Sequence, residues 1–308
     1  MEILITGGLG YLGARLSKFL LNQGWGIRIF DCKSKNKDFI DEKYELKIGD
    51  ISDKAKLLDA CKNIYCVIHL AGLDQEKCKE DPNLAFEVNA LGTKNVLEAA
   101  QKSNVKKFIY MSTFHVYGKQ NGTITENTTP LAVKEYAKSK LAGEKYLNNF
   151  NSTMKCIILR LSNVYGASAN DKGWNLVVNN LCMQAAKQQK IILKTKGIQK
   201  RDFVGIDDVS QAVSIILKMD SNQLRENIFN VGGDNLLSIN ELAKLVSKAY
   251  FEAYGKEIKI EFDKNSKEEK SDDFTFDISR IRKLGYMPRS DMVKEIKETF
   301  IAAGDNIA

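Results

Sequence analysis

The first half of the chain alternates between two patterns of hydrophobic positions. Short runs rich in β-branched and aromatic residues are typical of strands, and longer stretches with an apolar residue every three or four positions are typical of helices. The predicted strands are 2–6, 26–30, 44–48, 65–70, 107–111 and 156–161, and the predicted helices between them are 11–22, 54–61, 82–102 and 133–149. This strand–helix alternation predicts an α/β fold with a doubly wound parallel sheet.

After residue 166 the alternation gives way to mixed elements. We predict helices at 175–188, 207–219, 238–254 and 291–303, with a short apolar run at 191–193. The segment 263–273 is dense in charge and poor in apolar residues, which predicts a loop. The pattern therefore divides the chain into residues 1–166, to which later segments are expected to return, and a smaller α/β part at 167–308 over the carboxyl edge of the sheet.

Composition excludes several classes of protein. With 308 residues, 44% of them hydrophobic, the chain can bury a substantial core. No apolar run approaches the roughly 18 residues of a membrane span, and no signal core precedes the first strand, so we expect no membrane association and a cytoplasmic location. Six cysteines without a CxxC pair are expected to be reduced thiols. Two distant histidines argue against a zinc site or a Ser-His-Asp triad, and we predict no metal.

The chain is basic, with 46 Lys and Arg against 39 Asp and Glu and a net charge of +7. These charges alternate in sign along amphipathic stretches such as 138–145, which is typical of solvated helix faces. No stripe of basic and aromatic residues is present, so we predict no nucleic-acid binding. A positive balance does suit a substrate that carries phosphates.

The segment TGGLGYLG at residues 6–13 follows the first strand and opens the first helix. Gly7, Gly10 and Gly13 allow a tight turn, close approach of backbone N–H groups to a pyrophosphate, and helix–strand packing. Asp31, at the end of the second strand, can bind a ribose 2′-hydroxyl and would repel a 2′-phosphate. This Rossmann-type arrangement predicts NAD rather than NADP, although Lys33 and Lys35 lie near enough in sequence to offset part of the repulsion.

Two groups of residues are candidates for the chemistry. Tyr136 and Lys140 stand one helical turn apart on the same face, where an ammonium is expected to lower the pKa of the phenol toward the range of general acid–base catalysis. Ser112 and Thr113 end a buried strand, at the edge where open parallel sheets bind ligands. The hydroxyls and the Tyr/Lys pair are therefore expected to meet beside the nicotinamide.

Together these motifs resemble the extended short-chain dehydrogenase/reductase family, in its nucleotide-sugar epimerase/dehydratase branch, over nearly the whole chain. The matching segments are TGxxGxxG at 6–13, Asp50-Ile51, His-Leu-Ala-Gly at 69–72, Asn89-x-x-Gly92-Thr93, the Ser/Thr-rich strand end running to Val-Tyr-Gly at 112–118, Arg160 to Gly166, and Arg-Asp-Phe-Val at 201–204. The resemblance implies a dinucleotide-binding part at 1–166 and a mainly substrate-binding part at 167–308.

The resemblance also implies roles for individual residues. Tyr136 would be the general acid/base, Lys140 would tune it and hold the nicotinamide ribose, and Thr113 would hydrogen-bond the reacting sugar oxygen. Substrate contacts would come from Thr113, His115, Asn163 and Arg201, and cofactor contacts from Gly7, Gly10, Tyr11, Leu12, Asp31, Asp50, Ile51, Leu70, Ala71, Gly72, Asn89, Ser112, Tyr136 and Lys140. Two of the motif residues have structural alternatives, since Asn89 can tie backbone to backbone and His69 is expected to be a packed core residue.

Three departures from the branch narrow the function. Dehydratases carry Thr-Asp-Glu where this chain has Thr113-Phe114-His115, so dehydration is not expected. Asp74 replaces a lysine common in galactose-type epimerases, and 267–270 replace an Arg-x-Gly-Asp segment, which leaves the sugar and the nucleotide open. We therefore expect an NAD-dependent epimerase acting at C4 of a nucleotide sugar, with a C4 dehydrogenase or a 4-ketosugar reductase as alternatives.

Two further expectations concern assembly and turnover. The resemblance implies a homodimer formed through helices 82–102 and 133–149. A non-catalytic protein that senses the cofactor is an alternative of another class, against which the intact Thr113, Tyr136 and Lys140 argue.

Overall fold

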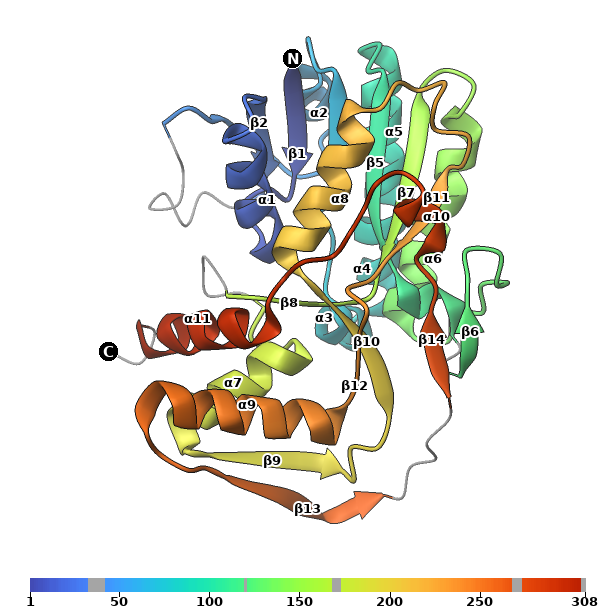
Figure 1. Cartoon of the computed structure of the whole chain (residues 1–308). Coiled ribbons are helices and arrows are strands. Elements are labelled where there is room, and N and C mark those ends of the chain that lie inside the picture. The colour runs from blue at the N-terminus through green and yellow to red at the C-terminus, as the bar shows by residue number, and fades with distance from the viewer. Residues whose placement is uncertain (33–41, 119–120, 168–172, 268–272, 306–308) are drawn as a thin grey trace.

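A computed structural model describes residues 1–32, 42–118, 121–167, 173–267 and 273–305 (Figure 1). Its centre is a seven-stranded sheet in which every strand pairs in parallel with its neighbours. The strand order is β11 (Ile228–Val231), β7 (Lys155–Leu161), β5 (Lys107–Thr113), β4 (Cys66–His69), β1 (Glu2–Thr6), β2 (Gly26–Asp31) and β3 (Glu45–Ile48). The predicted doubly wound parallel sheet is confirmed, and the edge strand β11 comes from the second half of the chain.

Helices cover both faces of this sheet because its central strands are apolar on both sides. In β1, for example, Ile3 and Ile5 lie in one core cluster and Leu4 lies in the other. The first cluster receives side chains of α1 (Tyr11–Leu21) and α8 (Ile206–Lys218), and the second receives those of α2 (Lys54–Ala60), α5 (Gly92–Lys102) and α6 (Glu135–Leu147). Helices packed on both faces hold in place the strand ends that bear the candidate catalytic residues.

The rest of the chain builds a third apolar cluster below the sheet (Figure 1). Helices α7 (Val177–Gln188), α9 (Ile239–Tyr254) and α11 (Met292–Asp305) contribute to it, together with the parallel pair β9 (Lys190–Thr195) and β13 (Lys259–Lys267). A small sheet of β12 (Asn235–Ser238), β10 (Lys200–Gly205) and β8 (Asn163–Tyr165) leads into it, and β14 (Phe274–Phe276) pairs with β6 (Gly122–Ile124).

Two predicted elements differ from the structure. The single helix predicted at 82–102 is divided into α4 (Pro82–Phe86), a π-helical turn (Glu87–Leu91) and α5, and α3 (Gln75–Glu80) precedes them. The loop predicted at 263–273 is wrong in part, because strand β13 runs to Lys267, while 268–272 lie outside the described residues. Strand β13 has few apolar residues and is specified by its pairing with β9, which the local pattern does not show.

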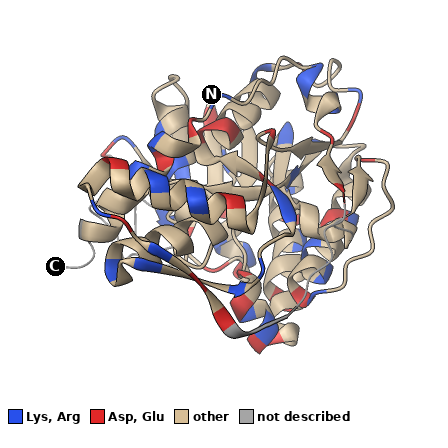
Figure 2. Cartoon of the chain, turned by 60° about the horizontal axis from the view of Figure 1, so that its bottom comes forward, with Lys and Arg blue, Asp and Glu red and all other residues tan. Residues whose placement is uncertain are grey.

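Charged side chains on the lower face are mixed in sign. Figure 2 shows Lys and Arg close to Asp and Glu along its helices and strands. Lys190 pairs with Glu261 at 3.9 Å, and Lys297 pairs with Glu252 at 2.7 Å. None of the described helices combines the length and the apolar character that crossing a membrane requires.

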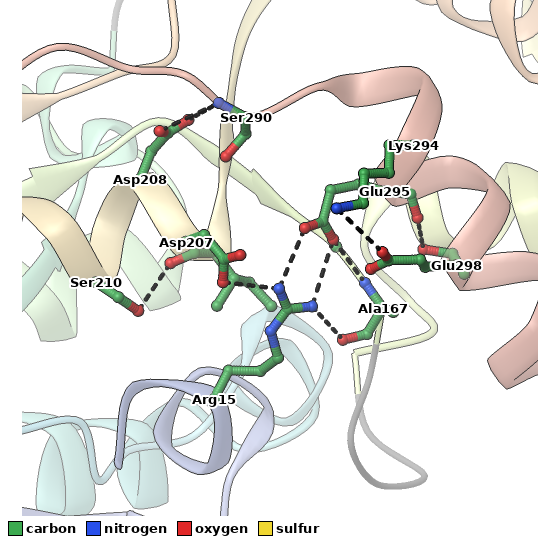
Figure 3. Close-up of polar contacts among 12 residues, drawn as sticks. Arg15, Ala167, Asp207, Asp208, Ser210, Ser290, Lys294, Glu295 and Glu298 are labelled. Carbon is green, nitrogen blue, oxygen red and sulfur yellow. Dashed lines mark hydrogen bonds and ion pairs between the residues drawn. The ribbon is translucent and has the colours of Figure 1, made fainter. Parts of the chain in front are cut away.

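A charged cluster joins helix α1 to the lower part (Figure 3). The guanidinium of Arg15 on α1 contacts Asp207 on α8 at 2.7 Å and Glu295 on α11 at 3.1 Å. Glu295 also accepts a hydrogen bond from the backbone N–H of Ala167 (3.3 Å). The helix that follows the glycine-rich turn is thereby tied to the elements that lie over the carboxyl edge of the sheet.

Candidate active site

The glycine-rich turn lies directly against the end of strand β4. Gly7 has a φ of +70°, and a Cβ there would come within 2.7 Å of the backbone nitrogen of Ala71. A Cβ on Gly13 would lie 2.4 Å from the carbonyl oxygen of Gly7. Helix α1 begins after Gly10, whose missing side chain leaves the first N–H groups of the helix without a side-chain cap. A turn that excludes side chains at a helix N-terminus fits the pyrophosphate of a dinucleotide.

The two carboxylates predicted to bind the cofactor, Asp31 and Asp50, lie at the ends of the neighbouring strands β2 and β3. Asp31 ends β2 and accepts a hydrogen bond from the backbone N–H of Leu9 in the turn (3.0 Å), so the turn and the predicted ribose-binding residue are held together. Asp50 accepts from the N–H of Ser52 (2.8 Å), and Ile51 is buried next to it. Lys33 and Lys35 lie outside the described residues.

Leu70, Ala71 and Gly72 continue from β4 and form the wall behind the turn. The backbone N–H of Leu70 donates to the carbonyl of Thr6 (3.0 Å). His69 is fully buried between the hydroxyls of Thr6 (2.6 Å) and Thr93 (3.0 Å), and burial lowers its pKa to about 3. The expectation of a packed core histidine is confirmed.

Asn89 lies in the π-helical turn and is buried. Its side chain accepts from the N–H of Leu73 (2.7 Å) and donates to the hydroxyl of Ser139 (2.9 Å) and to the thiol sulfur of Cys78 (3.4 Å). The amide also donates to the carbonyl of Leu73 (3.3 Å), so Asn89 holds both backbone groups of that residue, as the backbone-tying alternative expects.

Tyr136 and Lys140 lie on one face of α6, as predicted. Lys140 is buried with its ammonium 4.1 Å from the centre of the Tyr110 ring, and burial lowers its pKa to about 8. The pKa of Tyr136, however, is raised above its ordinary value by burial and, to a smaller extent, by Cys78 and Asp74. The expected lowering is therefore wrong for the protein alone, because desolvation of the phenolate dominates this pKa and Lys140 is not among the groups that shift it.

Ser112 and Thr113 end β5, and the chain then turns into a short 3₁₀ helix (Phe114–Tyr117). The hydroxyl oxygen of Thr113 accepts from the backbone N–H of His115 (3.3 Å). The His115 ring lies edge-on to the Tyr136 ring, 6.4 Å between centroids. This contact brings the end of β5 beside the start of α6, so the predicted hydroxyls and phenol share one region.

The remaining predicted residues lie on the small sheet of β8 and β10 and at the start of α1. Asn163 on β8 donates to the carbonyl of Asp202 (2.9 Å), and Arg201 on β10 donates to Gln199 (2.9 Å). The hydroxyl of Tyr11 donates to the carbonyl of Gly166 (2.8 Å), which links the glycine-rich turn to β8, while Leu12 packs against the first core cluster.

Sequence reasoning missed two side chains near the site. Gln75 in α3 lies 2.9 Å from the Nε2 of His115. Glu144, one turn beyond Lys140 on α6, binds both Ser112 and Arg160. The spacing from Lys140 to Glu144 was a usable signal, but the pairing with Arg160 on β7 depends on how helix and sheet pack.

A Gly7→Ala substitution should disable the turn. The methyl group would meet Ala71 in a backbone conformation that side chains rarely adopt, so we expect a loss of about 2 kcal/mol in stability and no rise in melting temperature on adding NAD. Gly24→Ala is the matched control, because Gly24 has a φ of +84° and no atom within 4 Å of a Cβ. Its NAD-induced shift should equal that of the parent, and an intact shift in Gly7→Ala would contradict this reading.

Lys140→Met should stabilise the protein in a pH-dependent way. Because the folded state lowers the pKa of Lys140 from 10.5 to about 8, it binds fewer protons than the unfolded state between these pH values, and stability rises with pH there. The variant lacks this penalty, so its advantage in urea unfolding should be largest at pH 7 and shrink toward pH 10.5. Lys138→Met, at an exposed position on the same helix, should show no such trend. An advantage independent of pH would refute the prediction.

Comparisons with known proteins agree with this geometry. The model of the NAD dependent epimerase/dehydratase family matches residues 3–232. The chain is 31% identical to a putative UDP-glucose 4-epimerase of Methanocaldococcus jannaschii over 304 residues (96% of each chain), and 31% identical to the CDP-paratose 2-epimerase of Salmonella typhi over 287 residues (80% and 83%). The solved UDP-glucose 4-epimerase of Thermus thermophilus, in complex with NAD, superposes with a TM-score of 0.83 at 26% identity, covering 99% of both chains. This chain therefore belongs to the NAD-dependent epimerase/dehydratase family.

Proposed function

We propose that this protein is an NAD-dependent epimerase that inverts C4 of a nucleotide-diphosphate sugar through a 4-keto intermediate. One observation carries the proposal. Tyr136 and Lys140 share one face of α6, and the Tyr136 ring lies 6.4 Å from the ring of His115, whose backbone N–H binds Thr113 at the end of β5. The two side chains that follow Thr113 are not acids. This set of groups suits removal and return of a proton at a sugar hydroxyl, without elimination of water.

Tyr136 is the proposed base. In the protein alone its raised pKa keeps the phenol neutral, so catalysis requires positive charge near it. Lys140 is protonated at neutral pH, since its pKa is about 8, and favours the phenolate. When bound, NAD supplies a hydride acceptor and donor and a positively charged ring. The Tyr136 oxygen then takes the proton of the C4 hydroxyl and later returns it to the keto oxygen.

Thr113 is the proposed hydrogen-bond donor to the sugar oxygen. Its hydroxyl oxygen already accepts from the N–H of His115, and a hydroxyl has only one proton to donate, which this contact leaves unused. A donor at this position stabilises negative charge on the sugar oxygen as the proton is transferred.

The residues after Thr113 argue against dehydration. Phe114 is buried and apolar. Burial, together with nearby Lys134 and Arg201, lowers the pKa of His115 to about 4, so at neutral pH its ring is uncharged. Neither residue offers the acidic pair that elimination of water requires.

The nucleotide is proposed to be uridine diphosphate. The Methanocaldococcus and Thermus proteins described above are both named as UDP-glucose 4-epimerases. Arg201 and Asn163, which the family resemblance assigns to the diphosphate, lie on adjacent strands β10 and β8. A guanidinium beside an amide suits recognition of phosphate oxygens.

Tyr136→Phe should lower turnover at least about 100-fold, because it removes the acid–base group while keeping the ring. Purified protein and NAD are incubated with UDP-, GDP-, dTDP- and CDP-hexoses, and the products are resolved by chromatography and mass spectrometry. A new peak of unchanged mass is expected with a UDP-hexose. Tyr146→Phe, on the same helix, should behave as the parent. A product lighter by two hydrogen atoms with NADH formed would instead show a dehydrogenase, and equal rates in Tyr136→Phe would overturn the catalytic assignment.

We also propose a homodimer formed through α4, α5 and α6. Helices α4 and α5 pack beside α6, and the surface there exposes Leu84 (42%), Phe86 (45%) and Leu91 (38%). Clustered apolar side chains of this kind are typical of a surface that another protein covers.

Replacing Leu84 and Phe86 together by Arg should convert the dimer to a monomer in size-exclusion chromatography with light scattering, because two charges would be buried unpaired in the interface. Ile301→Arg on α11 is the control, since this side chain is 63% exposed and lies outside these helices. The proposal fails if the parent protein has the mass of a monomer.

A further inference from the structure

A buried ion pair lies directly behind the candidate site. Glu144 on α6 and Arg160 on β7 are 4% and 2% exposed. The guanidinium binds both carboxylate oxygens, with Nε 3.0 Å from Oε1 and Nη2 2.6 Å from Oε2. Bidentate pairing of this kind fixes the orientation of both groups.

A second set of contacts holds the guanidinium in place. Arg160 lies over the ring of Tyr117, 4.7 Å from its centre. The hydroxyl of Tyr117 in turn donates to the side chain of Asn230 on β11 (2.6 Å). The carboxylate is therefore anchored through Arg160 to two strands of the main sheet and to the turn after β5.

The consequence concerns the hydroxyl of Ser112. It donates to Oε1 of Glu144 at 2.5 Å, and because a carboxylate can only accept, the single proton of the hydroxyl is committed to this bond. Any further partner of the Ser112 oxygen must then be a hydrogen-bond donor. The neighbouring Thr113 is placed in the opposite way, since its oxygen accepts from a backbone N–H and its proton remains available.

We propose that Glu144, held by Arg160, is a positioning residue that fixes Ser112 as a hydrogen-bond acceptor toward the amide N–H₂ of the NAD nicotinamide. The inference rests on the proposed function only in that the nicotinamide lies at the end of β5. Its test measures cofactor binding, so it is independent of whether any sugar is turned over.

The test compares NAD with nicotinic acid adenine dinucleotide by calorimetric titration of the purified protein. Nicotinic acid adenine dinucleotide carries a carboxylate in place of the amide. It therefore has no N–H to donate, and its carboxylate oxygens would face the Ser112 oxygen, which is also an acceptor. We expect the parent to prefer NAD by about tenfold, the size of one hydrogen bond lost with its partner left unsatisfied. The double variant Glu144→Leu/Arg160→Met removes both charges without leaving either buried alone. Its Ser112 hydroxyl is then able to rotate and donate, and the preference should fall to within about twofold.

Ser112→Ala is the second variant in this test, and it leaves the Glu144–Arg160 ion pair intact. It should weaken NAD binding and reduce the preference to the same level as the double variant. Combining all three substitutions should add no further loss, because Glu144 acts through Ser112.

Three results would overturn the inference: a folded double variant that keeps the preference of the parent, losses that add fully in the triple variant, or a parent that binds both compounds equally. If the double variant does not fold, an unchanged preference in Ser112→Ala is sufficient to refute it. The proposed function stands or fails separately, by the Tyr136→Phe assay.

Discussion

The parallel alignment of the seven central strands is the constraint on which the site depends. Because all of them run in one direction, β1, β4, β5 and β7 deliver their last residues to the same edge of the sheet. A hydrogen-bonded line from Thr6 through His69 to Thr93 joins two of these strands to α5. The glycine-rich turn can approach this edge only because Gly7 has no side chain to meet Ala71.

In the candidate site, side chains whose burial favours the neutral form lie near a buried ion pair. Lys140 and the Tyr136 phenol have pKa values shifted toward their neutral forms, and His69 is buried uncharged. Glu144 and Arg160 form a buried pair of full charges held by bidentate contact, while Nη1 of Arg160 has no hydrogen-bond partner among the described residues. Such a site costs stability in the protein alone, and the cost is consistent with a fold selected to bind a charged cofactor.

Much of the fold and part of the candidate site were accessible from the sequence. Strand–helix periodicity located the central sheet, and the glycine spacing with Asp31 located the dinucleotide turn. The helix at 82–102 was predicted as unbroken because its apolar period continues through the π-helical turn, which is stabilised by tertiary contacts. Among these, Asn89 donates to the hydroxyl of Ser139 on α6 (2.9 Å) and Gly92 packs against Ile51.

By itself the sequence determined which residue types stand at which strand ends, because hydrophobic period and glycine position are local properties. Only the tertiary structure decided the protonation and the hydrogen-bond partners of these residues. Burial raises the pKa of Tyr136 although a lysine lies one turn away, and a glutamate from α6 meets an arginine from β7 behind Ser112. Desolvation and hydrogen-bond direction depend on every element packed around a group, and residue spacing along one element does not contain that information.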